Sequence, residues 1–483
     1  MNPSIASLIC ACGIAGLFYL DRDDSVRTSK ALWLPVVYLW IIGSRPFSFW
    51  LGVAPSNGAN VQLDGSPVDA LFFGLLLAAA VVVLIRRGKR TRTLITANWP
   101  ILIYFLYCLV SVAWSYHPDV ALKRWIKAIG DLAMVLIVVT DGQPVAALRR
   151  LFSRVGFLLL PTSVLFIKYY GYLGRGYTPD GAPMNTGVTD NKNSLGLIVF
   201  LLSLGTLWHF LALLRAKEQP HRRRHLFAQG ILLAFGVALL GMADSATSLV
   251  CFILGSVLML LAQLPLISRR PGRIHAFVAV LLLVGVFAML FGGQSGVTHA
   301  LGRQANFSGR TEIWTDVIAA VPNPIVGAGF ESFWISPCVE KVYQAMTSWW
   351  DPRGLNEAHN GYIEVYANLG WVGLGLIVFV LIGGYVRAAA AFFRNPPVGS
   401  LLLAYVVTAV VYSATEAGFR YLIPMWIFLL LSIVGASAVS AGYFDAATRQ
   451  ILTPRSTTPH EMSTGKGLKY PGPRYANYSP VAR

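Results

Sequence analysis

Arg310 and His359 stand at the two ends of the stretch of this chain where chemistry is most expected. Arg310 belongs to GRTEIW (309–314), and His359 belongs to EAHNGYIE (357–364). An arginine keeps its positive charge and can contact phosphate, whereas a histidine can exchange a proton near neutral pH. Each also has a structural alternative, since Arg310 can be a solvated surface charge and His359 can simply begin a helix. The sequence around the two residues is needed to choose between these functional and structural roles.

Both residues lie in a long polar insert, about 293–359, within a strongly apolar chain. Of the 483 residues, 55% are hydrophobic and 13% are charged, and the mean hydropathy is +0.59. Soluble domains carry about 25% charged residues, so this composition indicates an integral membrane protein. A polytopic membrane protein keeps most of its loops short. A long loop rich in Arg, Trp, Gly and carboxylates is therefore where we expect the function.

The apolar stretches predict an all-α, polytopic fold with about 12 or 13 transmembrane helices and one long extracytoplasmic loop, since about 20 apolar residues cross a hydrocarbon core. The chain then divides into N-terminal transmembrane helices (1–292), a periplasmic loop with short amphipathic helices (293–359), C-terminal transmembrane helices (360–441) and a cytoplasmic, disordered tail (442–483). The predicted spans lie near 3–20, 31–50, 69–85, 99–114, 124–140, 151–170, 195–214, 226–241, 248–267, 275–292, 360–386, 399–416 and 421–441.

The formal net charge of +17 is distributed as in a membrane protein and argues against nucleic acid as a partner. The basic blocks are short loops at 86–93, 215–225 and 268–273 and the tail after residue 445. Under the positive-inside rule all of these are cytoplasmic. The loops at 45–68, 115–123, 171–194 and 293–359 then lie on the opposite side. The N-terminus lies on that side too, although one misplaced early span would reverse it.

The insert itself predicts an amphipathic helix followed by an aromatic segment. Apolar residues recur at helical spacing between 313 and 321, with Ser308 as the cap. Arg310 falls in the first turn and is free to point away from the apolar face. The aromatic residues of NPIVGAGFESFW (323–334) predict a segment that lies on the bilayer surface.

Taken together, three segments resemble a known family. GRTEIW (309–314), PNPIVGAGFESFW (322–334) and HNGYIEVYANLGWVGLGL (359–376) are similar to the signature region of the O-antigen ligase and Wzy-type polymerase superfamily. The similarity is greatest to the exopolysaccharide production (ExoQ-like) branch. Comparable segments also occur outside the insert, at 43–52, 174–196 and 244–248.

The resemblance implies a glycosyltransferase that uses neither a metal nor a cofactor and faces the periplasm from the bacterial inner membrane. Its donor would be a polyprenyl-pyrophosphate-linked oligosaccharide, and its acceptor a hydroxyl of a second glycan. By similarity His359 is the general base and Arg310 a pyrophosphate ligand. Partners implied besides the substrates are membrane lipid, a flippase and chain-length regulator proteins.

Further substrate-binding residues are predicted from cations and amides at the extracytoplasmic ends of the spans. The family commonly has an arginine near the Ser/Thr step where this chain has Asp244, and Lys192 or Arg420 would replace it. Many relatives also have His where this chain has Asn191. The predicted substrate-binding set is Arg45, Arg175, Lys192, Asn193, Asn360, Glu364 and Arg420.

Two classes of function stay open on sequence grounds. A transporter or flippase for lipid-linked oligosaccharide would carry ionisable residues deep within several spans, whereas here the candidates cluster at span ends and on the insert, which favours the enzyme. Within the enzymes, a polymerase and a ligase onto lipid A core share the same donor and differ only in the acceptor. The ExoQ-like resemblance favours the polymerase. Asp21 and Asp23 form an Asp-x-Asp pair, but without a globular domain they do not indicate a metal site.

Overall fold

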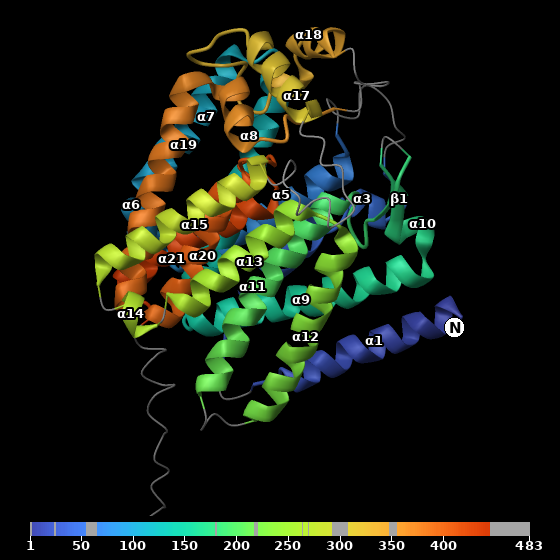
Figure 1. Ribbon diagram of the computed structural model, residues 1–483, viewed down its shortest axis with the longest axis vertical. Helices are drawn as coiled ribbons and strands as arrows, with labels where there is room; N and C mark the ends of the chain where they lie inside the picture. The colour runs from blue at the N-terminus through green and yellow to red at the C-terminus, as the bar shows by residue number, and fades with distance from the viewer. Residues whose placement is uncertain are drawn as a thin grey trace, which may run out of the picture.

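The computed structural model describes residues 2–23, 26–54, 65–178, 181–216, 221–262, 264–268, 270–291, 308–346 and 355–444. Within these residues the chain is a packed set of helices with one small hairpin (Figure 1). The prediction of an all-α polytopic membrane protein is confirmed, with the hairpin as a local exception. Most of the predicted tail and the first part of the insert, residues 292–307, lie outside the described residues.

The first half of the chain forms helices that often begin with proline, whose fixed φ suits the first helical turn, as at Pro67, Pro118 and Pro144. The hairpin strands β1 (Arg175–Tyr177) and β2 (Pro183–Asn185) pair antiparallel, with Gly176 opposite Met184. The helices are α1 (Pro3–Leu20), η1 (Lys30–Leu32), α2 (Trp33–Ile42), α3 (Phe47–Trp50), α5 (Pro67–Arg86), α6 (Gly88–Ala97), α7 (Trp99–Val110), η2 (Ser111–Trp114), α8 (Pro118–Val139), α9 (Pro144–Tyr169) and α10 (Gly171–Gly174).

The second half holds the insert and the helices that flank it. Figure 1 places α17 and α18 of the insert at one end of the molecule and α14 at the other. The helices are α11 (Lys192–Arg215), α12 (Arg222–Ala243), α13 (Ala246–Leu261), α14 (Pro265–Ser268), α15 (Pro271–Phe291), α17 (Ser308–Ala320), η3 (Phe333–Ile335), α18 (Cys338–Ala345), α19 (Gly361–Arg394), α20 (Pro396–Tyr412) and α21 (Pro424–Ser440).

The described helices contain fewer full-length spans than the 12 or 13 apolar stretches predicted. Six of them, α1, α5, α9, α11, α12 and α19, are long and apolar enough to cross a membrane, and the bent pair of α6 with α7 and η2 raises this to seven. Five further apolar helices have 10–17 residues. At about 1.5 Å per residue these cover less than a full hydrocarbon core. The predicted span at 31–50, for example, stops at Ile42, before the Ser44-Arg45-Pro46 step.

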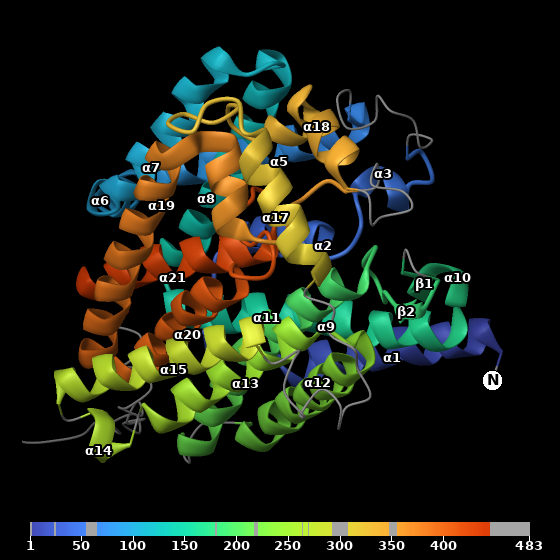
Figure 2. The same ribbon diagram turned by 45° about the horizontal axis from the view of Figure 1, so that its top comes forward.

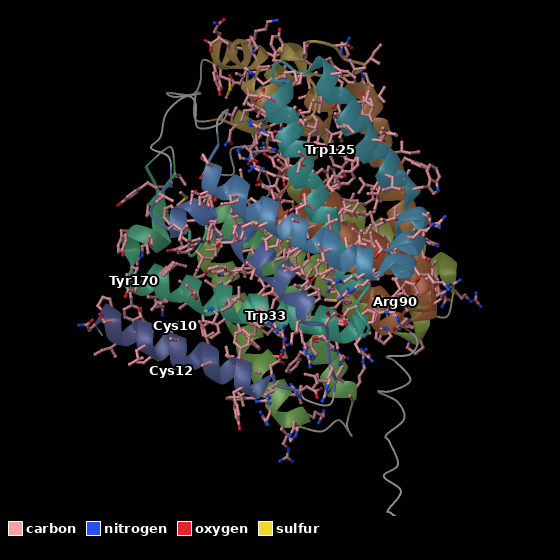
Figure 3. All side chains as sticks on the ribbon, turned by 180° about the vertical axis from the view of Figure 1, so that it is seen from behind. Cys10, Cys12, Trp33, Arg90, Trp125 and Tyr170 are labelled. Carbon is pink, nitrogen blue, oxygen red and sulfur yellow. The ribbon has the colours of Figure 1, made fainter. Side chains whose placement is uncertain are left out.

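The loops that charge places on one side of the membrane contact one another. Arg45 donates from Nε to the carbonyl of Thr189 at 3.1 Å, which joins the 45–68 loop to the 171–194 loop. Asn193 reaches Glu416, beyond α20, at 3.2 Å. Figure 3 shows Tyr170, next to these loops, and Arg90, in a basic block, on opposite sides of the molecule. The grouping agrees with the charge pattern of the sequence.

The insert is fastened to α19 through a break in that helix. Gly370 has a φ of 64° and interrupts the helical backbone. The amide of Trp371 then donates to the carbonyl of Pro324 at 2.8 Å, and the amide of Ala328 donates to the carbonyl of Ala367 at 3.0 Å. Backbone groups that an unbroken helix would pair internally thus bind the insert instead. Figure 2 shows α17 of the insert running beside the first part of α19.

The aromatic segment of the insert is buried in the protein, so the prediction that it lies on the bilayer surface is wrong. Phe333 is 0% exposed and Trp334 is 7% exposed. The indole of Trp334 donates to both carboxylate oxygens of Glu364 at 3.0 Å, and Asn368 accepts the amide of Phe333 at 3.0 Å. These polar partners on α19 explain the difference, because they satisfy inside the protein the groups that would otherwise have sought the membrane interface.

The break at Gly370 generates a stability prediction. A Cβ at this position would overlap the backbone of Ile325 and Val326, and the positive φ is unfavourable for any L side chain. Gly370→Ala is expected to lower the free energy of unfolding by about 2 kcal/mol or more. Gly375→Ala is the matched control, since a Cβ at Gly375 has no neighbour within 4 Å. Thermal unfolding of both variants in detergent measures the difference, and equal midpoints would contradict the role of the break.

Candidate active site

Arg310 extends from the first turn of α17 to the segment that follows α20. Its Nη2 donates to Oε1 of Glu416 at 3.0 Å, and its Nη1 donates to the carbonyl of Thr415. Ile313 and Val317, three and seven residues after Arg310, are 0% exposed. The apolar spacing thus predicts the buried residues of α17 correctly, but Arg310 lies on the same side of the helix as they do rather than pointing away from them, because positions three and seven residues apart share a helix face. The side chain of Ser308, the predicted cap, lies outside the described part.

His359 occupies the turn directly before α19, with a φ of 50°. This left-handed conformation costs a non-glycine residue about 1–3 kcal/mol, so the surroundings have to hold it. Asn360 caps α19 through Oδ1, and its Nδ2 donates to the carbonyl of Ala414 at 3.1 Å. On the other side, the indole of Trp314 donates to the carbonyl of Ala358 at 2.9 Å. The histidine is thus fixed from both flanks.

Glu416 is the point at which the two predicted catalytic residues meet. Its Oε1 accepts from Arg310 and from Nδ2 of Asn193 at 3.2 Å, and its Oε2 lies 3.4 Å from Nδ1 of His359. Glu416 is only 4% exposed. Three segments that are far apart in the sequence are therefore joined by one buried carboxylate.

Arg420 forms a second branch of the same cluster. Its Nε lies 3.1 Å from Oε2 of Glu331, in the insert, and its Nη1 lies 3.8 Å from Oε2 of Glu357. Glu357 in turn lies 2.9 Å from Nδ1 of His359. Arg310, Arg420 and a protonated His359 are thereby matched by three carboxylates. The cluster is charge-balanced without any further ion.

The carboxylates change the proton affinity of His359. Burial alone would lower the pKa of His359, but its hydrogen bonds to Glu357 and Glu416 outweigh burial and raise the pKa to about 10. Burial would likewise raise the pKa of Glu357, yet the hydrogen bond from His359 and the charge of Arg420 lower it to about 2. In the resting protein at neutral pH, His359 is therefore an imidazolium.

The same side chains have the geometry of a possible metal site. Glu357, His359 and Glu416 each offer one ligand atom, and these atoms lie within 4.8 Å of one another. Two of the three ligands, however, already pair with guanidinium groups of Arg310 and Arg420. A divalent cation would have to replace both arginines, so the donor set is better suited to the ion pairs that it makes.

The loop that carries Glu416 and Arg420 is also bound by Asp131 of α8. Oδ2 of Asp131 accepts the backbone amide of Leu422 at 3.1 Å, and Oδ1 accepts the hydroxyl of Tyr38 at 2.7 Å. Asp131 is 0% exposed, and Leu422 has a positive φ of 57°. A buried carboxylate with both oxygens engaged fixes the loop more firmly than apolar contact alone.

Other predicted substrate-binding residues lie outside this cluster. Arg45 contacts backbone carbonyls of the 171–194 loop, and its guanidinium lies 4.6 Å from the ring centre of Phe49. Arg175 donates from Nε to the carbonyl of Ile167 at 2.8 Å. Both contacts brace the hairpin region. A role for either residue in binding substrate stays a prediction.

Lys192 and Glu364 also have partners of their own. Nζ of Lys192 lies 3.8 Å from Oδ2 of Asp244, the residue found where relatives often have arginine. Glu364 is 1% exposed and accepts from the indole of Trp334 and from the amide of Ala358, next to His359. Glu364 thus shapes the histidine turn, while Asn193 and Arg420 are the members of the predicted set that reach the cluster.

Sequence reasoning missed the three carboxylates Glu331, Glu357 and Glu416. The resemblance indicates cations that can hold phosphate, and it does not single out the acidic residues of the same loops. A signal was present: Glu416 is the last residue of the predicted span at 399–416, four residues before Arg420. A carboxylate at the end of a span, among cations, needs a partner.

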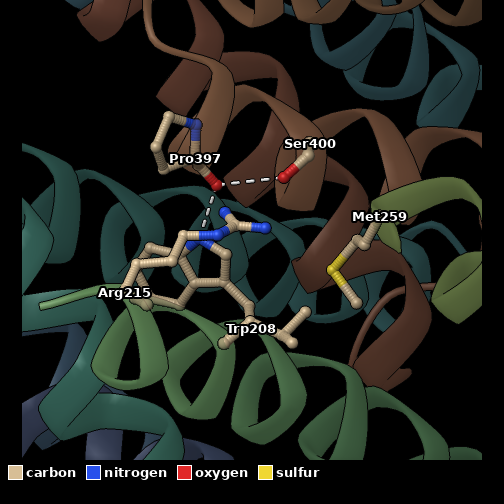
Figure 4. A pocket seen from close by; sticks show the side chains of 7 residues that line it. Trp208, Arg215, Met259, Pro397 and Ser400 are labelled. Atoms are coloured by element: carbon tan, nitrogen blue, oxygen red, sulfur yellow. Dashed lines mark hydrogen bonds between the residues drawn. The ribbon is translucent and has the colours of Figure 1, made fainter. Parts of the chain in front are cut away.

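A small pocket elsewhere in the described structure does not compete with this site. It is lined by Trp208, Leu211, Ala212, Arg215, Met259, Pro397 and Ser400 (Figure 4). Trp208 lies about 22 Å along α11 from Asn193, at 1.5 Å per residue. The carbonyl of Pro397 already accepts from Trp208 at 2.6 Å and from Ser400 at 3.1 Å. Its polar lining is therefore largely paired within the protein.

Comparison with known proteins gives two matches. Residues 230–378 match a family model described as O-antigen ligase, a stretch that includes Arg310 and His359 but not Glu416. The chain is also similar to the exopolysaccharide production protein ExoQ of Rhizobium meliloti (strain 1021), with 27% identity over 292 residues. That alignment covers 59% of this chain and 64% of the relative, which is less than two thirds of the relative's length.

The matched residues contain the three segments that carry the resemblance. They also include α17, whose first turn meets Glu416, and α13, whose first turn contacts Thr415. This chain is thus similar to the O-antigen ligase family over residues 230–378, and to the exopolysaccharide production protein ExoQ over 59% of its length.

Proposed function

We propose that this protein is a polysaccharide polymerase of exopolysaccharide production. It would transfer a glycan from a polyprenyl-pyrophosphate carrier to a hydroxyl of an acceptor glycan, on the outer face of a bacterial inner membrane. The observation that supports this most strongly is the convergence of Arg310 and His359 on Glu416. A phosphate-binding cation and a proton acceptor are the two groups that this transfer requires.

Arg310 is proposed to hold the pyrophosphate of the donor. Its guanidinium remains charged at a membrane boundary and can bind two phosphate oxygens at once. As the bond between the anomeric carbon and the phosphate oxygen breaks, negative charge grows on the leaving pyrophosphate, and Arg310 stabilises it there. Arg420, which reaches the same cluster, is the nearest second cation.

His359 is proposed to take the proton from the acceptor hydroxyl through Nε2 while its Nδ1 stays bound to Glu357. The hydroxyl oxygen then forms the new bond to the anomeric carbon. A carboxylate at Nδ1 orients the ring and stabilises the imidazolium that forms, as in other carboxylate and histidine pairs. Because Glu357 and Glu416 make His359 an imidazolium at rest, and its side chain is 27% exposed, it must first lose its proton to water in order to act as the base.

A ligase is the second candidate, and the description of the matching family model favours it. It would use the same donor and transfer the glycan to lipid A core. Either enzyme would depend on a flippase to deliver the donor, and a polymerase would in addition work with chain-length regulators. The polymerase is preferred because the relative named above is an exopolysaccharide production protein.

A deletion strain tests the choice between the two functions. Loss of high-molecular-weight exopolysaccharide with intact lipopolysaccharide is expected for a polymerase. The wild-type gene should restore the polymer, and a gene encoding Arg310→Ala should not. Lys341→Ala is the control, because that lysine is an exposed cation on the insert helix α18. Loss of O-antigen from lipid A core would instead identify a ligase, and no change in either glycan would contradict both.

The pKa of His359 leads to a prediction for the pH dependence of turnover. Below its raised pKa, the neutral form of His359 becomes about tenfold more abundant for each unit by which the pH rises. For a general base, kcat/KM should therefore rise with pH and level off near pH 10, where the pKa lies. His359→Gln should lower turnover by about 100-fold or more and abolish this dependence. His117→Gln, in another predicted extracytoplasmic loop, should do neither. A profile that is flat and then falls at high pH would show that the imidazolium is the active form.

A further inference from the structure

The first turns of four helices touch one short segment, residues 413–416. Asn193 of α11 donates to Glu416, and Thr247 of α13 lies 3.1 Å from the hydroxyl of Thr415. Arg310 of α17 binds Glu416 as well, and the amide of Gly361, the first residue of α19, donates to the carbonyl of Ser413 at 2.8 Å. The N-termini of four helices, which are the positive ends of their dipoles, therefore lie close to the same segment.

The segment that these helices surround already contains an anion, the carboxylate of Glu416. It is buried, and its two oxygens contact Arg310, His359 and Asn193. These are all predicted site residues, and two of them carry positive charge at neutral pH. Beside it, the hydroxyl of Ser413 is buried and has no hydrogen-bond partner within the described structure. A carboxylate on Arg310 takes the place that a phosphate oxygen would take.

We infer that Glu416 is a resident competitor for the donor's phosphates: it neutralises Arg310 at rest, and the pyrophosphate of the donor has to displace it. This inference rests on the proposed function, because it concerns the occupancy of the same site. Two anions cannot share Arg310 at close range without strong repulsion. Binding of the donor and release of Glu416 are therefore one exchange.

The surrounding contacts allow this exchange because Arg310 and His359 each keep a hydrogen-bond partner when Glu416 leaves. When Glu416 withdraws, Arg310 keeps the carbonyl of Thr415, and His359 keeps Glu357 at 2.9 Å. The contact of Glu416 with His359 is the longer of the two, at 3.4 Å. Glu416 also belongs to the turn between α20 and α21 rather than to a helix. A side chain on a turn can move with less disruption than one within a helix.

Binding of inorganic pyrophosphate to the purified full-length protein in detergent tests this inference without requiring turnover. Glu416→Gln removes the competing charge and keeps the shape of the side chain, so it should bind pyrophosphate at least about tenfold more tightly than the wild type. Asp141→Asn is the matched control. Asp141 is also a buried carboxylate paired with an arginine, but its partner is Arg87, in a predicted cytoplasmic loop, so its removal should change affinity by less than about threefold.

Two further variants locate the bound anion. Glu416→Gln combined with Arg310→Ala should lose the gain in affinity, because the anion is expected on Arg310. Glu416→Asp keeps the charge but shortens the side chain, and it should tighten binding by less than Glu416→Gln does. This variant also keeps the test available if Glu416→Gln does not fold.

Equal gains in the Glu416→Gln and Asp141→Asn variants would show a general charge effect and overturn the inference. Unchanged or weaker binding by Glu416→Gln would overturn it too. If pyrophosphate binding follows the expected pattern while the deletion strain keeps its polymer, the proposed function fails and the anion exchange stands. If the polymer is lost but Glu416→Gln binds pyrophosphate no more tightly than the wild type, the proposed function stands and the anion exchange fails.

Discussion

The buried carboxylate of Glu416 is the interaction on which the arrangement of this site depends. It gathers Arg310 from the insert, His359 from the start of α19 and Asn193 from the start of α11. Removing one partner from a buried ion pair leaves an uncompensated charge, which is far more costly than losing an exposed pair. The need to satisfy this one group therefore constrains three helices and the loop after α20 together.

The rest of the fold supplies the rigidity that such a cluster needs. The break at Gly370 exposes backbone groups of α19 that bind the insert, and the aromatic residues behind it bury the remaining face of the insert. Asp131 accepts the backbone amide of Leu422 and so fixes the loop that carries Glu416. The charged residues are thus placed by backbone hydrogen bonds and buried packing, while their own charges nearly cancel.

The sequence permits prediction of properties that depend on residues near one another in the chain. It does not permit prediction of contacts between residues that are far apart in the chain. Apolar runs and basic loops predict the membrane class and the grouping of the loops, and helical spacing predicts which residues of α17 are buried. The segment around Phe333 was misplaced because aromatic residues suit both a bilayer surface and a protein core, and its partner Asn368 lies on another helix. Glu416 was missed for the same reason, since its partners come together only after folding.

The central claim is that Arg310 and His359 act as one site, and a double-mutant cycle on turnover measures this directly. Purified protein is given lipid-pyrophosphate-linked repeat units in excess chelator, and polymer formation is compared for Arg310→Ala, His359→Ala and the double variant. If the two residues serve one transition state, the double variant is expected to lose little more activity than the more damaging single variant. Losses that multiply would show two independent contributions, and robust turnover by either single variant would contradict the account.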